Sequence, residues 1–161
     1  MAENQNPIQS IETQERYTLP AMIARAARAL ASATTAGEIL EAKHHANVAY
    51  FEAKSLGRMA RARKAHDEVI GAVYRAQANA LEIEARAKIR LADEYDAAQE
   101  RGEVKRNGGD RSTLESRETA SAADLGLRHD QIQEARQLRN AEAADPGFIR
   151  KTLSDMVEAG E

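Results

Sequence analysis

Three observations predict an all-α fold: a long stretch without proline, apolar residues that recur in steps of three and four, and an apolar content rich in alanine. The prolines are Pro7, Pro20 and Pro146, so none interrupts residues 21–145. Only 4% of the 161 residues are aromatic and 30% are charged, which is typical of amphipathic helices with solvated faces. We expect a long alanine-rich helical hairpin or coiled coil, followed by a small C-terminal helix-turn-helix module.

The chain begins with a polar, aperiodic stretch, residues 1–18, which we expect to be a disordered tail. A first helix follows from about Pro20, because proline is favoured in a first turn, to about Ala33. Thr35-Ala-Gly-Glu38 matches a capping box, in which the threonine hydroxyl accepts a backbone hydrogen bond and the glutamate reaches back. A second helix should therefore begin near Ala36.

Small and apolar residues then repeat every seven positions, which places them along one seam. The seam loses its register between Arg61 and His66, so the helix either turns back there or stutters, and we favour an antiparallel turn. Alanine buries little area, so we expect residues 19–102 to form a dimer or higher oligomer. The seam comprises Ile39, Ala42, Ala46, Ala49, Ala53, Leu56, Ala60, Val69 or Ile70, Val73, Ala76, Ala80, Ile83, Ala87 and Leu91. Tyr50, Phe51 and Tyr74 are expected to be packing residues.

Glycine and proline mark the remaining boundaries. Gly102 should end the long helix, and residues 103–118 are charged and rich in turn formers, as expected of a flexible linker. Residues 119–161 should form the C-terminal module. Its last helix should start at Asp145 and Pro146, as N-cap and first-turn residue, and end at Gly160. The apolar face of that helix is expected to comprise Phe148, Ile149, Leu153 and Met156 or Val157.

The segment from residue 122 to residue 138 has the spacing of a helix-turn-helix. A small residue lets two helices approach, a glycine takes the turn, and aliphatic residues fill the wedge between them. The residues in these roles are Ala122, Leu125, Gly126, Leu127 and Ile132. An ordinary helical hairpin with a glycine turn is the alternative.

If the segment is a helix-turn-helix, we expect it to bind double-stranded DNA. Arginine can pair with guanine and glutamine with adenine, so the candidates for base reading are Arg128, His129, Gln131, Gln133 and Gln137. The candidates for phosphate contact are Thr119, Ser121, Arg136, Lys54, Arg58, Arg61, Lys64, Lys105 and Arg106. Asp130 and Glu134 oppose DNA binding, and the net charge of −3 gives no general attraction, so affinity would depend on the oligomer and on the basic clusters. Lys54, Arg58, Arg61, Arg63 and Lys64 form the first of these clusters, which could equally be an ordinary solvated helix surface.

Other chemistry is not expected. The chain has no cysteine, and the adjacent His44 and His45 point in different directions on a helix, so we expect no metal site and no cofactor. No serine nucleophile accompanies His66 and Asp67, so we do not expect an enzyme. Neither a signal peptide nor a long apolar run is present, so we expect a cytoplasmic protein that binds no membrane.

The chain also resembles a known protein family. The resemblance is carried by Thr35-x-x-Glu-Ile, by Ala-Arg-Ala-Lys-Ile-Arg-Leu-Ala-Asp-Glu-Tyr (85–95), by the glycine-rich break and by Ala-Asp-Leu-Gly-Leu (123–127). These motifs resemble small proteins of bacterial prophages and plasmids that have no settled biochemical function. The chain departs from the family pattern at Asp93-Glu-Tyr, where the family has glutamate and glycine. The resemblance implies a mobile-element setting and a DNA-binding role.

Two functions remain open. The first is a DNA-binding regulator or DNA-organising factor of a mobile element, dimeric through its coil. The second is a coiled-coil structural or adaptor protein that binds another protein, possibly of the same element, and not DNA.

Overall fold

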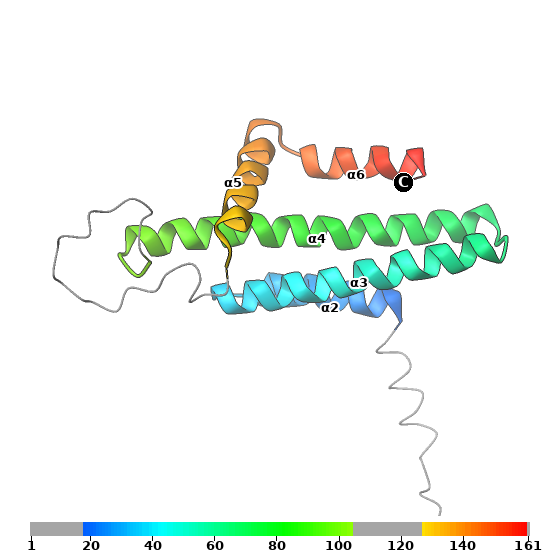
Figure 1. The fold of residues 1–161 in the computed structure, drawn as a ribbon, viewed down its shortest axis with the longest axis horizontal. Coiled ribbons are helices and arrows are strands. Elements are labelled where there is room, and N and C mark those ends of the chain that lie inside the picture. The colour runs from blue at the N-terminus through cyan, green and yellow to red at the C-terminus, as the bar shows by residue number, and fades with distance from the viewer. Residues whose placement is uncertain (1–17, 105–126, 161) are drawn as a thin grey trace, which may run out of the picture.

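The computed structural model describes residues 18–104 and 127–160, and within these ranges it contains five helices and no strand. The predicted all-α class is therefore confirmed. The predicted tail (1–17 of it) and most of the predicted linker (105–118) lie outside the described residues. In Figure 1, α4 is the long central helix, with α2 and α3 along one side and with α5 and α6 on the other. The helices are α2 (Leu19–Ser32), α3 (Ala36–Ala62), α4 (Asp67–Glu100), α5 (His129–Ala144) and α6 (Phe148–Ala159).

The start of α3 has the predicted capping box. The Glu38 backbone N–H donates to Thr35 Oγ1 at 3.2 Å, and the Thr35 backbone N–H donates to Glu38 Oε2 at 3.1 Å. A further hydrogen bond from the Thr34 backbone N–H to the same oxygen is the main cause that lowers the pKa of Glu38. These bonds satisfy N–H groups that a helix start leaves without partners.

The chain turns back between α3 and α4, at the point where the seam loses its register (Figure 1). The turn includes Lys64 in a left-handed conformation, with φ of 52°. At the end of the buried α3 seam the buried residue is Gly57 and not the expected Leu56. Only a glycine fits there without a shift, because a Cβ at residue 57 would lie 3.3 Å from Val73 Cγ1 of α4. The other buried α3 residues are Ile39, Ala42, Ala46, Ala49 and Ala53, and those of α4 include Tyr74, Ala80, Ala87 and Leu91.

Helix α4 has 34 residues and is therefore about 51 Å long at about 1.5 Å per residue. It ends as predicted at Gly102, whose φ of 75° is left-handed. The Glu103 backbone N–H then donates to the Ala98 carbonyl at 2.9 Å, which satisfies one of the last carbonyls of the helix.

The main apolar cluster lies where α2, α3, α4 and the start of α5 meet. It includes Leu30, Ile39, Leu91, Tyr95, Leu127 and Ile132. Two of the residues predicted to fill the helix-turn-helix wedge, Leu127 and Ile132, are thus buried in the same cluster as residues of α2–α4. The other three residues of the motif, Ala122, Leu125 and Gly126, lie outside the described residues.

The start of α6 corrects the sequence prediction. The helix begins at Phe148 and not at Pro146, and its N-cap is Gly147 with a left-handed φ of 95°. The Glu142 carboxylate replaces a capping side chain, since it accepts hydrogen bonds from the backbone N–H groups of Gly147 at 2.9 Å and Ile149 at 3.0 Å. Gly160 ends the helix as predicted. Phe148, expected on the apolar face, is an exposed residue, whereas Ile149 is buried.

Candidate nucleic-acid interface

Helix α5 places three of the five candidate base readers on one exposed face. His129, Gln133 and Gln137 recur every four residues, and all three are exposed. Asn140 continues this row, and the sequence analysis missed it although its spacing of three from Gln137 was visible. The opposite face of α5 is buried at Ile132 and at Ala135.

The other two candidate base readers take part in contacts at the start of α5. The Arg128 guanidinium donates to Asp130 Oδ1 at 3.0 Å, and this bond is the main cause that lowers the pKa of Asp130. The Gln131 Oε1 accepts from the Arg128 backbone N–H at 3.1 Å, as a helix cap does. Both side chains are exposed, but each has an intramolecular partner.

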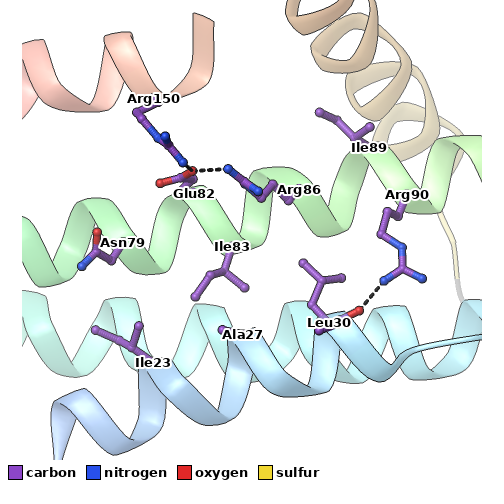
Figure 2. A pocket seen from close by; sticks show the side chains of 11 residues that line it. Ile23, Ala27, Leu30, Asn79, Glu82, Ile83, Arg86, Ile89, Arg90 and Arg150 are labelled. Carbon is purple, nitrogen blue, oxygen red and sulfur yellow. Dashed lines mark hydrogen bonds and ion pairs between the residues drawn. The ribbon is translucent and has the colours of Figure 1, made fainter. Parts of the chain in front are cut away.

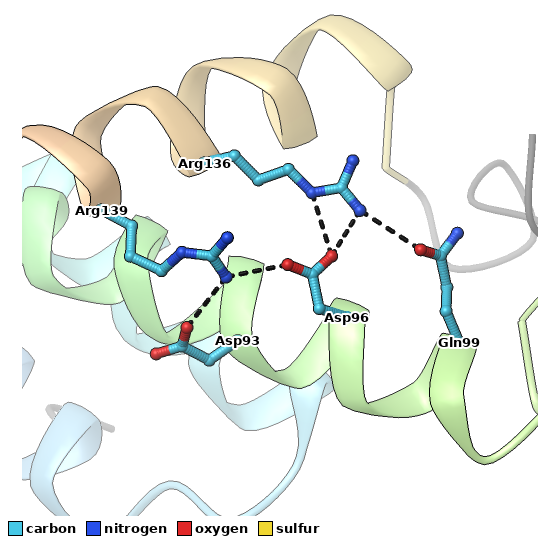
Figure 3. Close-up of polar contacts among 5 residues, drawn as sticks. All are labelled: Asp93, Asp96, Gln99, Arg136 and Arg139. Atoms are coloured by element: carbon cyan, nitrogen blue, oxygen red, sulfur yellow. Dashed lines mark hydrogen bonds and ion pairs between the residues drawn. The ribbon is translucent and has the colours of Figure 1, made fainter.

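Arg136, a candidate phosphate contact, faces α4 and pairs with Asp96, forty residues earlier in the sequence (Figure 3). Its Nε lies 2.9 Å from Asp96 Oδ1, its Nη2 lies 3.2 Å from Gln99 Oε1, and its guanidinium lies over the ring of Tyr95. Arg136 cannot reach a phosphate while it keeps these contacts. The sequence could not show this, because no local pattern connects the two helices.

Arg139 completes the network shown in Figure 3, donating to Asp96 Oδ2 at 2.8 Å and to Asp93 Oδ1 at 3.0 Å. Burial tends to raise the pKa of Asp96, but hydrogen bonds from Arg136 and Arg139 outweigh it and lower that pKa. Two arginines on one carboxylate thus fix the orientation of α5 on α4.

Glu134, one of the two carboxylates that count against DNA binding, also has a partner on α4. The Lys88 Nζ lies 2.8 Å from Glu134 Oε1 and 3.4 Å from Glu84 Oε1. Asp130 pairs with Arg128, so both carboxylates that count against DNA binding have a cationic partner, although Glu134 shares Lys88 with Glu84.

The end of α3 and the turn after it form a basic surface, which we call the basic end and define as Lys54, Arg58, Arg61, Arg63 and Lys64. All five side chains are exposed. None of them forms an ion pair with another described residue. Lys54 lies over the ring of Tyr50 and Arg61 over the ring of Tyr74, with distances to the ring centroids of 5.6 and 5.1 Å. Such contacts orient a cation but do not neutralise it.

The cations around α5 and the far end of α4 behave differently. Most of them have a carboxylate partner, and Arg75 of α4 and Lys151 of α6 are exceptions among the described residues. The paired cations are Arg86, Lys88, Arg101, Arg128, Arg136, Arg139 and Arg150. Arg90 instead donates to the Leu30 carbonyl and, at 2.6 Å, to the Ala33 carbonyl. Arg61 of the basic end lies over Tyr74 of α4, and Arg136 of α5 pairs with Asp96 of α4. Tyr74 and Asp96 are 22 residues apart, which corresponds to about 33 Å along the helix. The basic end and the exposed face of α5 are therefore two separate surfaces.

A groove of about 700 Å³ lies over α4 between α2 and α6 (Figure 2). Its apolar wall comes from Ile23, Ala27 and Leu30 of α2 and from Ile83 of α4. At the α6 side, Arg86 and Arg150 both donate to one oxygen of Glu82, at 2.6 and 3.0 Å. Their hydrogen bonds outweigh the effect of burial and lower the pKa of Glu82.

The remaining predictions concern four more phosphate contacts, a metal site and a membrane span. Lys105, Arg106, Thr119 and Ser121 lie outside the described residues. His45 lies 3.5 Å from Glu41, and no group of three metal-ligating side chains occurs in the described part of the chain. No described helix is both long enough and apolar enough to cross a membrane.

Comparison with known proteins gives no relative: no family model matches the chain, and no similar curated protein or solved structure was found.

Proposed function

We propose that this protein binds double-stranded DNA, with the basic end as its phosphate contact and the exposed face of α5 as its base-reading element. The observation that carries the proposal is the uneven pairing of the cations. Those near α5 are engaged by carboxylates or carbonyls, whereas the five of the basic end have no ion-pair partner among the described residues. These five cations lie close together and have no ion-pair partner among the described residues, although the net charge of the chain is −3. Such a group of cations suits an external polyanion.

The base-reading part of the proposal uses α5 as the second helix of a helix-turn-helix. Its row of His129, Gln133, Gln137 and Asn140 carries the amide groups that can pair with adenine. The Asp96 network supports this role because a reading helix needs a rigid scaffold. The first helix of the motif would come from residues 119–126, outside the described residues. We further propose that the chain dimerises, because one copy offers only a few base contacts.

The test is a fluorescence-anisotropy titration of a mixed-sequence duplex across a salt series. Replacing Lys54, Arg58 and Arg61 together by Gln should lower the slope of log affinity against log salt by about 2 to 3, close to one per lost phosphate contact. The matched control is Arg25→Gln with Arg28→Gln, since both arginines are exposed, lie on α2 and have no ion pair among the described residues. An equal loss of slope in the control would refute a specific role of the basic end.

Base reading is tested on a preferred duplex selected from a random pool. Gln133→Ala with Gln137→Ala should remove the preference for that duplex, by about 1 to 3 kcal/mol per bidentate contact, and leave nonspecific affinity unchanged. If the preference survives, α5 is not the reader. If no duplex binds even at low salt, the whole proposal fails.

The second candidate function is a structural or adaptor protein of helical hairpins. The groove in Figure 2 favours it, because an apolar strip between two helices can accept a partner helix. Under this alternative the basic-end variant should change no interaction of the protein, and Ile83→Asp should release a co-purifying protein.

A further inference from the structure

The outer surface of α3, away from the seam with α4, has two parallel edges of different chemistry. Successive residues of a helix are turned by about 100°, and on this basis the two edges lie roughly a quarter-turn apart. The apolar edge is formed by Val48, Phe51 and Met59. The cationic edge is formed by Lys54, Arg58 and Arg61, which are also part of the basic end.

The apolar edge is exposed although its residues are large. The exposed fractions are 41% for Val48, 58% for Phe51 and 44% for Met59. Phe51 was expected to pack inside the fold, but it is the most exposed of the three, and its ring lies at 63° to the ring of Tyr50 with centroids 5.4 Å apart. Much of an aromatic side chain is thus open beside a row of cations.

We propose that this surface binds a single-stranded nucleic acid, with phosphates along the cationic edge and unpaired bases against the apolar edge, stacked on Phe51. A duplex presents its phosphates but keeps its base faces stacked inside, so it can contact only the cationic edge. A single strand offers both, and bases stack on exposed aromatic side chains in single-strand binding proteins. The two edges together span residues 48–61, about 20 Å, which suits a site of a few nucleotides.

A membrane surface fits the same region less well. Helices that lie on anionic membranes carry lysine and arginine along their polar face. Here the cationic edge lies on one side of the apolar edge, and the other side carries the carboxylates of Glu41 and Glu52, both exposed, with Arg63 only at its end. Anionic lipids would repel these two groups, whereas a narrow single strand leaves them in water.

The inference rests on the proposed nucleic-acid binding by the basic end and adds a second ligand, an unpaired strand that uses the apolar edge as well. Because the chain contains no tryptophan, Phe51→Trp introduces a single tryptophan at the stacking position, and its emission can be separated from that of the four tyrosines. Its emission should be quenched by the oligonucleotide dT12 and not by a duplex of the same length. Phe148→Trp on α6, also at an exposed phenylalanine, is the control and should respond to neither.

Affinity provides the second readout. Phe51→Ala should weaken dT12 binding at least about fivefold, the lower end of what a lost base–aromatic stack costs. Duplex affinity should not change, and neither affinity should change in Phe148→Ala. If Phe51→Ala binds dT12 as the parent chain does, the inference is overturned while duplex binding stands.

Three further outcomes are decisive. A blue shift of the emission of the Phe51→Trp variant with phosphatidylserine vesicles, without quenching by dT12, would assign the surface to membranes. A concentration-dependent change of its emission without any DNA, matched by a larger mass in light scattering, would assign it to a second copy of the chain. Either result overturns the single-strand site. Failure of the parent chain to bind any nucleic acid overturns the proposed function and, with it, this inference.

Discussion

Asp96 joins α5 to α4, and its replacement measures how firmly the candidate reading helix is held. In the variant Asp96→Asn the side chain keeps its shape but loses its charge, so Arg136 and Arg139 each lose an ion pair. Asp96 and Arg136 are each 31% exposed, so solvent screens their attraction in part. An exposed pair contributes about 0.2 to 1 kcal/mol. Two partly screened pairs should therefore contribute about 1 to 1.5 kcal/mol to the docking of α5.

Amide hydrogen exchange is the suitable assay because the expected effect is local. Exchange of the α5 amides should accelerate about five- to tenfold in Asp96→Asn, which corresponds to the stated energy, since helices can open below the free energy of global unfolding. Amides of the α3–α4 seam should exchange at unchanged rates. The urea midpoint of the whole chain should fall only slightly.

Asp93→Asn is the matched control, since Asp93 holds only Arg139 and its side chain is 59% exposed. It should cost less than about 0.5 kcal/mol. The reasoning is refuted if the two variants behave alike, or if exchange in Asp96→Asn accelerates as much in the seam as in α5. In the first case the buried residues Leu127 and Ile132, and not the ion pairs, would hold the helix; in the second, α5 would open only together with the seam.

Three other predictions follow from the caps and the carboxylates. Thr35→Ala removes the acceptor of the capping box and should destabilise the chain by about 1 kcal/mol, measured as a lower urea midpoint, whereas Thr35→Ser should restore most of it. Glu142→Gln should loosen α6, because the charged acceptor of the Gly147 and Ile149 amides is lost, and faster exchange of those amides would show it. Acid should release α5 and α6 before the seam, because the pKa of Asp96 and that of Glu142 are lowered by their partners in the folded chain. The stability that these two carboxylates contribute is complete above the usual pKa values near 4. It is lost as the pH falls through the lowered folded-state values. Exchange at steps from about pH 5 to about pH 2 tests the order, and simultaneous loss of all helices would contradict it.

Local signals in the sequence predicted much of the fold. Thr35 and Glu38 are three residues apart, and Gly102 is a glycine just past the last turn of α4, so each boundary depends on near neighbours that can be read directly. The start of α6 was misplaced by two residues because a side chain seven residues earlier, Glu142, caps Ile149 and lets Gly147 take a left-handed turn. No pattern of proline and N-cap residues signals such a contact.

The candidate site was harder to predict, since its properties depend on contacts between distant helices. Arg136 was a reasonable phosphate contact as an isolated cation, but Asp96 on α4 engages it. Phe51 was expected to be buried because it is aromatic, yet the seam passes on the opposite side of α3 and leaves its ring exposed. Charge and hydropathy identify such residues, but only tertiary packing decides which of them remain accessible.

The alanine seam between α3 and α4 has an evolutionary consequence. Ala42, Ala46, Ala49 and Ala53 are fully buried, yet each contributes only a methyl group to the contact. Shortening one of them to glycine should be tolerated at about 1 kcal/mol, whereas a longer side chain at any one position would separate the helices along neighbouring turns. Drift should therefore freely exchange alanine, glycine and serine along the seam and purge larger residues. The hairpin would then persist through sequence changes that keep these four side chains small.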